Sequence, residues 1–150
     1  MKYWLVKSEP EVFSISDLKR EKTTLWDSVR NYQARNYLKV MAVGDLVLYY
    51  HSNAEPSGVA GICKVSKVAA PDPTQFDKKS EYFDPKATKE EPRWFAPEMK
   101  FVKEFSSVIP LAELKANAAL KNMVVLQKGS RLSVQPVTEK EFLIVEALRR

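Results

Sequence analysis

The densest group of side chains able to recognise a ligand lies in residues 26–36. This segment holds an indole, a phenol, two guanidinium groups and several carboxamides. An aromatic face can stack a nucleic-acid base at about 1–3 kcal/mol per base, and a carboxamide offers a donor and an acceptor to a base edge. Arg30 and Arg35 can contact phosphates bidentately. The segment therefore has the chemistry of a nucleic-acid binding site.

A structural interpretation of the same residues stays open. Trp26 and Tyr32 can be core aromatics, Asn31 can do no more than cap the following helix, and the arginines can be solvated. For each residue taken alone, composition favours this interpretation. A binding role depends on their acting together.

Catalytic constellations find less support. The chain has one histidine, His51, so a two-histidine metal site and the H-E-x-x-H pattern are excluded. Ser8 or Ser52 can be paired with His51, but nothing in the sequence supplies an acid to orient the ring. Cys63 lies between Ile62 and Lys64 in an apolar segment and is typical of a small buried residue. We predict no catalytic residue, no metal and no cofactor.

The positive charge is concentrated near the same segment. The whole chain carries a net charge of +5, and residues 19–39 contain six basic and two acidic residues, a local balance of +4. Such a stretch can attract phosphates through its summed field and through counterion release. The alternative is a solvated face without a partner.

Length and composition bound the remaining classes. A chain of 150 residues predicts a single domain, residues 1–150, and 45% hydrophobic residues suffice for a core without staples. The lone Cys63 rules out an internal disulfide and a Cys-based zinc site. The apolar run at the start of the chain is too short for a signal peptide, and no later apolar segment approaches the length of a membrane-spanning helix. We expect a cytoplasmic protein, or a nuclear one in a eukaryote, with no membrane partner.

The elements that must position these residues follow from periodicity and caps. Strands are predicted at residues 3–7, 45–50, 58–68, 100–108 and 132–137, with the second and third forming a hairpin in which Gly61 marks a bulge or a close backbone approach. Helices are predicted at residues 14–21, 32–40 and 110–117, and after the capping box that begins at Thr138. Residues 25–31 are expected to be a loop, and residues 123–126 fit either type. Separated strands interrupted by short helices indicate an α+β domain with a small closed or half-closed sheet.

Residues 72–97 differ in character. With Pro71 they hold five of the nine prolines, together with mixed charges. We interpret them as a long excursion within one domain. The segment also contains aromatic residues, and these predict that parts of it fold back on the body: Phe76, Tyr82, Phe83, Trp94 and Phe95.

Four segments taken in order resemble the EVE domain, as in the thymocyte nuclear protein family and its bacterial relatives. They are YWLVKSEP at 3–10, WDSVRNYQARN at 26–36, the strand from Gly44-Asp45 to Tyr50-His51-Ser52, and RLSVQPV at 131–137. The resemblance spans residues 3–137. It implies a PUA-like fold, a small bent β-barrel with short helices around it that is related to the YTH and ASCH domains. It also implies binding of nucleic acid and, in several members, of modified bases such as methylated or hydroxymethylated cytosine.

Carried over residue by residue, the resemblance implies a base pocket with two rim residues: Ser8, Trp26, Asn31, Tyr32, His51 and Ser52, with Gln135 and Pro136 at the rim. Phosphate contacts are expected from Lys19, Arg20, Arg30 and Arg35. The leading hypothesis is a non-catalytic reader of DNA or RNA that accepts a flipped, modified base. Two alternatives remain: a hydrolase that acts on nucleic acid through His51, and a protein-interaction module that docks through residues 72–97.

Overall fold

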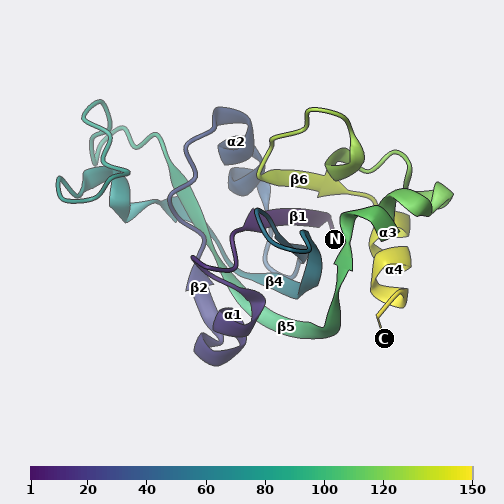
Figure 1. The fold of residues 1–150 in the computed structure, drawn as a ribbon. Helices are drawn as coiled ribbons and strands as arrows, with labels where there is room; N and C mark the ends of the chain where they lie inside the picture. The colour runs from purple at the N-terminus through teal and green to yellow at the C-terminus, as the bar shows by residue number, and fades with distance from the viewer. Residues whose placement is uncertain (150) are drawn as a thin grey trace.

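A computed structural model describes residues 1–149 and shows a mixed six-stranded sheet flanked by short helices (Figure 1). The strand order is β2-β5-β4-β3-β1-β6, and only the β1–β3 pair is parallel. The strands are β1 (Tyr3–Ser8), β2 (Thr23–Leu25), β3 (Leu46–His51), β4 (Gly58–Pro71), β5 (Phe95–Pro110) and β6 (Val134–Val137). The helices are α1 (Ile15–Glu21), α2 (Tyr32–Val40), α3 (Leu111–Ala116) and α4 (Glu139–Ala147), with the 3₁₀ turns η1 (Pro73–Phe76), η2 (Ala118–Leu120) and η3 (Val124–Leu126). The predicted α+β class is confirmed.

The long β4–β5 hairpin bends the sheet. Its register shifts at four places, and β5 sweeps beneath the other strands from one side of the molecule to the other (Figure 1). Gly61 lies at one shift, where an added Cβ would be 2.3 Å from the carbonyl oxygen of Lys103 and 2.7 Å from Cγ1 of Ile15. The predicted close approach at Gly61 is confirmed. The sheet is open, with β2 and β6 as its edges.

Side chains alternate along β1 and β3, and both faces of the sheet are buried. Trp4 and Val47 point to the core under α1 and α2, whereas Leu5 and Leu48 point to the core under α3 and α4. The prediction that the 45–50 strand is buried on both faces is confirmed. Because Ser8 follows the alternation of Trp4, it ends β1 on the α1 and α2 face.

Local capping explains the helices that were predicted correctly. Ser14 and Asp17 form the capping box of α1, Asn31 caps α2, and Thr138 begins the box of α4. Several bounds differ from prediction. Strand β2 was not predicted, and its last residue, Leu25, falls in the loop expected at 25–31. Strand β5 extends the 100–108 strand at both ends, and the ambiguous 123–126 segment contains the turn η3. The described residues contain no helix long and apolar enough to cross a bilayer.

The excursion, predicted at residues 72–97, ends earlier because β5 begins at Phe95, and residues 72–94 form the teal lobe at one side of Figure 1. Gln75 is fully buried at its base: its Nε2 donates to the carbonyl oxygens of Asp72 and Trp94, both at 2.8 Å, and its Oε1 accepts from the backbone N–H groups of Arg93 and Trp94. Trp94 is only 6% exposed. The predicted folding back of this segment is confirmed.

Candidate nucleic-acid interface

The ends of the parallel strands β1 and β3 bring Ser8 beside His51 in register. The Ser8 hydroxyl donates to the carbonyl oxygen of Phe13 at 2.8 Å, and the Tyr49 hydroxyl donates to the same oxygen at 2.6 Å. Burial raises the pKa of Tyr49, so its phenol stays protonated. The Ser8 oxygen, having donated its hydrogen inward, has only lone pairs left for a ligand.

His51 is engaged through one ring nitrogen. Its Nε2 accepts the backbone N–H of Ile15 at 3.1 Å, at the start of α1. Burial lowers the pKa of His51, and the nearby Glu104 and Asp17 oppose this only in part. The ring is therefore neutral near pH 7, and Nδ1 carries its proton. Because Nε2 is occupied, His51 can offer a ligand an N–H donor but no free base, and the hydrolase alternative loses the group on which it depended.

Trp26 joins this group through Tyr49. The indole meets the Tyr49 ring edge-on, with centroids 5.5 Å apart and an interplanar angle of 85°. Its backbone N–H donates to the carbonyl oxygen of Pro97 at 2.8 Å. The side chain is half-buried and packs against the core, as do Phe13 and Leu132. Ser8, Trp26 and His51 thus surround one end of the sheet.

Asn31 and Tyr32 lie at the start of α2 and point to different surroundings. Asn31 is exposed, and its Oδ1 accepts the backbone N–H of Ala34 at 2.9 Å, which leaves its amide N–H donors available. Tyr32 is 51% exposed and stacks on Trp94 of the excursion, with centroids 4.8 Å apart. Tyr32 therefore belongs to the surface beside the excursion.

Ser52, Gln135 and Pro136 flank the strand ends. The backbone N–H of Ser52 donates to the carbonyl oxygen of Ser8 at 3.0 Å. Gln135 is 1% exposed, pairs with Leu5 on the α3 and α4 face, and donates from Nε2 to the carbonyl oxygen of Leu132 at 2.7 Å. Pro136 is exposed, opposite Trp4. The Gln135 amide is thus committed inside the protein.

The residues predicted to contact phosphates differ in how firmly the protein itself binds their side chains. Lys19 and Arg20 lie on α1 with side chains 61% and 68% exposed, and their ion pairs are exposed ones with Glu104, Asp17 and Glu21. Such pairs contribute about 0–1 kcal/mol, so a phosphate can replace them at little cost.

Arg30 differs because its five N–H donors all have partners within the protein. They reach the carbonyl oxygens of Val29 and Tyr82, the carboxylate of Asp72 and the hydroxyl of Thr74. A phosphate contact by Arg30, which the sequence predicts, would require breaking these bonds. In this structure Arg30 holds the excursion against the loop before α2.

The chain is similar to known proteins over nearly its whole length. The model of the EVE domain family matches residues 2–148. The chain belongs to the EVE domain family. It is 44% identical over 165 residues to human thymocyte nuclear protein 1, in an alignment that covers 97% of this chain and 73% of the relative. The family predicted from the sequence is confirmed.

Solved structures agree over the full length. A Pseudomonas syringae protein superposes with a TM-score of 0.95 at 51% identity, covering 99% of both chains. Human thymocyte nuclear protein 1 in complex with DNA containing 5-methylcytosine superposes with a TM-score of 0.91 at 44% identity, covering 99% of this chain and 97% of that one. This EVE domain therefore has the expected PUA-like architecture.

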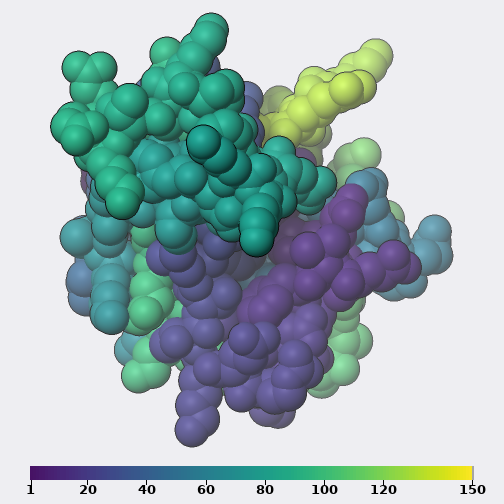
Figure 2. Space-filling view, turned by 90° about the vertical axis from the view of Figure 1, so that its left-hand side faces the viewer, coloured from purple at the N-terminus to yellow at the C-terminus, as the bar shows by residue number. Residues whose placement is uncertain are grey.

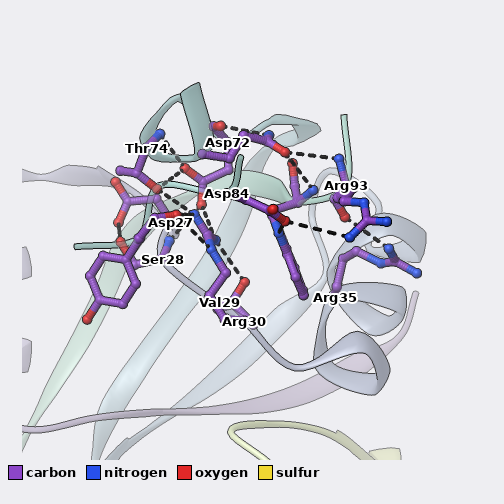
Figure 3. A network of polar contacts seen from close by, with 12 residues as sticks. Asp27, Ser28, Val29, Arg30, Arg35, Asp72, Thr74, Asp84 and Arg93 are labelled. Carbon is purple, nitrogen blue, oxygen red and sulfur yellow. Dashed lines mark hydrogen bonds and ion pairs between the residues drawn. The ribbon is translucent and has the colours of Figure 1, made fainter. Parts of the chain in front are cut away.

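The EVE domain also contains a buried polar network that sequence reasoning missed (Figure 3). Asp72, with its side chain 1% exposed, accepts from the backbone N–H of Ser28 at 2.7 Å, from Arg30 at 3.2 Å, and from the backbone and hydroxyl of Thr74. Burial alone would raise the pKa of Asp72, but the hydrogen bonds from Thr74, Ser28 and Arg30 outweigh it and lower the pKa. The Asp-Pro-Thr sequence at 72–74 is typical of a capped turn and was the one local signal.

Aromatic and guanidinium groups are layered beside this network. The Arg30 guanidinium carbon lies 5.2 Å from the Trp94 ring, Tyr32 stacks on Trp94, and the Arg35 guanidinium carbon lies 4.7 Å from the Tyr32 ring. Arg35 also donates to the carbonyl oxygen of Arg93 at 2.9 Å. The side of the EVE domain that carries the teal excursion also carries the purple segment before α1 and the α1 region below it (Figure 2).

Two hollows of about 550 Å³ lie elsewhere, and neither is lined by Trp26 or Asn31.

Proposed function

We propose that this EVE domain binds DNA and recognises a modified cytosine that has left the base stack. The observation that carries the proposal is the full-length similarity to human thymocyte nuclear protein 1, whose structure contains 5-methylcytosine DNA. The identity of 44% extends over nearly the whole of both chains, so the folds that present the two surfaces correspond.

The polar groups at the ends of β1 and β3, together with Asn31 at the start of α2, suit the edge of cytosine. Cytosine presents one amine donor and two acceptors, O2 and N3. The Ser8 oxygen can accept from the amine, while Nδ1 of His51 and the Asn31 amide can donate to the acceptors. Trp26 supplies the aromatic surface on which the base stacks. The indole is half-buried in this structure, so we expect it to shift when a base enters.

The phosphate backbone is assigned to Lys19 and Arg20 on α1 and to Arg35 on α2. The Arg35 guanidinium makes three hydrogen bonds within residues 1–149, to Asn36 and Arg93, against the five of Arg30. All three belong to residues 19–39, whose six basic and two acidic residues give a local charge of +4. Arg30 is left out because its donors are already paired. Unstacking a base costs a few kcal/mol, and these contacts together with stacking would offset it.

The experiment is fluorescence anisotropy with matched DNA and RNA oligonucleotides that carry cytosine, 5-methylcytosine or 5-hydroxymethylcytosine, at two ionic strengths. A pocket that senses one methyl or hydroxyl discriminates by about 1–3 kcal/mol, or roughly 10- to 200-fold in affinity. Binding should weaken steeply as salt rises, because phosphate contacts release counterions. Equal affinity for all DNA probes would overturn modified-base recognition, and affinity that ignores salt would favour a protein-interaction module.

A Trp26→Phe variant tests the location of the base. Phenylalanine keeps an aromatic edge against Tyr49, so the fold should persist, but the stacking surface shrinks. We expect a weaker preference for the modified probe with little change in the salt dependence. If Trp26→Phe weakens the affinity for modified and unmodified probes by the same factor, Trp26 contributes through the fold alone.

A further inference from the structure

One of the two hollows lies on the opposite face of the sheet from Ser8 and His51. It has a volume of about 550 Å³ and is lined by Lys7 of β1, Tyr50 of β3, α3 and the turn that follows η3. Lys7 and Tyr50 precede Ser8 and His51 by one residue, so strand alternation turns them to the α3 and α4 side. The hollow is therefore separate from the proposed base site.

Its charged lining is entirely positive. Lys7, Lys115 and Lys128 line the hollow, and no carboxylate does. Within residues 1–149 none of the three makes an ion pair. On α3 the carboxylate of Glu113 is engaged by Arg149 at 2.7 Å. Three lysines that line one hollow without a carboxylate attract an anion.

Lys7 is held in this position by burial and by Tyr50. It is half-buried, and its ammonium lies 5.7 Å from the centroid of the Tyr50 ring. Burial without a counter-charge lowers the pKa of Lys7. Burial removes part of the hydration of the ammonium, and a bound anion would stabilise the charged form in its place.

The rest of the wall combines apolar and uncharged polar residues. Leu111, Val125 and Leu126 form its apolar part beside the Tyr50 ring, and the turn after η3 adds Gln127, Gly129 and Ser130. The turn that carries Lys128 is anchored by Gln127, whose Nε2 donates to the carbonyl oxygens of Lys121 and Met123, both at 3.0 Å. A ligand that fits combines an anionic group with a flat or apolar body, and the volume lies within the range of about 300–1,000 Å³ typical of ligand pockets.

We propose that this hollow is a second binding site that takes the phosphate of a nucleotide, either free or within a DNA strand. Lys7, Lys115 and Lys128 hold the phosphate oxygens, and the nucleoside lies against Tyr50 and Leu111. The proposal does not depend on modified-base recognition, since it concerns another face of the sheet.

Titration of the ¹⁵N-labelled protein with inorganic phosphate and with deoxycytidine monophosphate tests the site. Amide shifts should concentrate at Lys7, Tyr50, Lys128 and Gly129, and the nucleotide should bind more tightly than phosphate. Shifts confined to α1 and residues 26–31, or an absence of saturable shifts, would overturn the proposal.

Two charge-matched double variants make the test specific. Lys115→Gln with Lys128→Gln removes two exposed lysines of the hollow, and Lys78→Gln with Lys79→Gln removes two exposed lysines of the excursion. We expect the first pair to weaken nucleotide binding by about tenfold and the second by less than about twofold. Equal weakening would indicate a general field effect and overturn the site.

Competition separates the two sources of phosphate. If an unmodified DNA oligonucleotide displaces the nucleotide from wild-type protein, the site holds a phosphate of the strand. If DNA and nucleotide bind together, it holds a free nucleotide. Both results support the proposal, and neither uses a modified probe, so they stand even if modified-base recognition fails.

Discussion

Nε2 of His51 lies 3.1 Å from the backbone nitrogen of Ile15 and accepts its N–H. This bond connects the end of β3 to the first turn of α1 and fixes the tautomer of the only histidine in the chain. It also requires a neutral ring, because a protonated Nε2 could not accept. The residue that sequence suggested as a base is thereby part of the packing between a strand and a helix.

This bond predicts a pH-dependent stability. Burial lowers the pKa of His51 below its ordinary value of 6.5, so the unfolded chain binds the proton more tightly than the folded one. The His51 contribution is complete above about pH 6.5, falls as pH drops below that value, and levels off below the folded pKa. Urea unfolding at pH 7.5, 6.0 and 5.0 measures it. The carboxylates with lowered pKa act only near and below their ordinary values, which are 3.8 for Asp17, Asp45, Asp72 and Asp84 and 4.5 for Glu113. Burial raises the pKa of Asp27, so that residue changes stability in the opposite direction above pH 3.8.

A His51→Gln variant is the control for this window. The carboxamide oxygen of the substituted side chain can accept the Ile15 N–H but does not titrate. We expect a loss of about 1 kcal/mol at pH 7.5, at the low end of the cost of an imperfectly paired buried donor, and a flatter profile between pH 6.5 and 5.0. An unchanged profile would assign the slope to other groups.

Breaking the Arg30–Asp72 ion pair should lower the free energy of unfolding substantially. Asp72→Asn keeps the side chain's size but removes the charge that faces a guanidinium only 21% exposed. Breaking a buried pair costs about 3–5 kcal/mol, and the partial exposure of Arg30 places the expected loss near the lower value. Urea unfolding checks it. Lys67→Ala is the matched comparison, because Lys67 pairs with Glu98 at 75% exposure and should cost about 0–1 kcal/mol.

The contrast between helices and strands shows what could be predicted from sequence. Helices α1, α2 and α4 begin at caps whose partners lie three residues away, so the signal is contained in the segment itself. Strand β2 has a three-residue span and exists because Thr23 pairs with Lys100 far along the chain. No local pattern encodes that pairing, and the same holds for Arg30 and Asp72, which lie 42 residues apart.

The candidate site shows the same division. The resemblance to the EVE domain implied that Trp26 and Tyr32 share one pocket. Residues 27–31 lie between them, and α2 begins at Tyr32, whose ring stacks on Trp94 while Trp26 packs against Tyr49. Ser8 and His51 do meet, because parallel pairing of β1 and β3 brings their ends together.

The close contact of Gly61 with β5 leaves no room for a side chain, so a larger residue there should lower stability. A Gly61→Ala substitution would place Cβ 2.3 Å from a backbone oxygen of β5, which cannot yield as a side chain does. We expect a loss of at least about 1–3 kcal/mol, the usual cost of overpacking, measured by thermal or urea unfolding. Gly44→Ala separates strain from clash: Gly44 has φ +94° and nothing within 4 Å of an added Cβ, so it should cost only about 1–2 kcal/mol. Equal costs would mean that β5 moves aside.

Asn31 separates a structural from a binding role. Its Oδ1 caps α2, so Asn31→Ala should lose about 1 kcal/mol of stability. Asn31→Ser keeps a capping oxygen but removes the amide donors, so its stability should stay within about 0.5 kcal/mol of wild type. If the amide donates to the modified base, Asn31→Ser should still weaken binding to 5-methylcytosine DNA by roughly two- to tenfold, the value of one hydrogen bond.

Asn117→Ser is the matched change, because Asn117 caps η2 through Oδ1 in the same way and lies in the segment between α3 and η2. Anisotropy with methylated DNA should show no effect of this variant. If Asn31→Ser binds the probe as tightly as Asn117→Ser, the carboxamide of Asn31 is only a helix cap. The base edge must then be read by Ser8 and His51 alone, and His51→Gln should weaken modified-base binding more than any substitution at the start of α2.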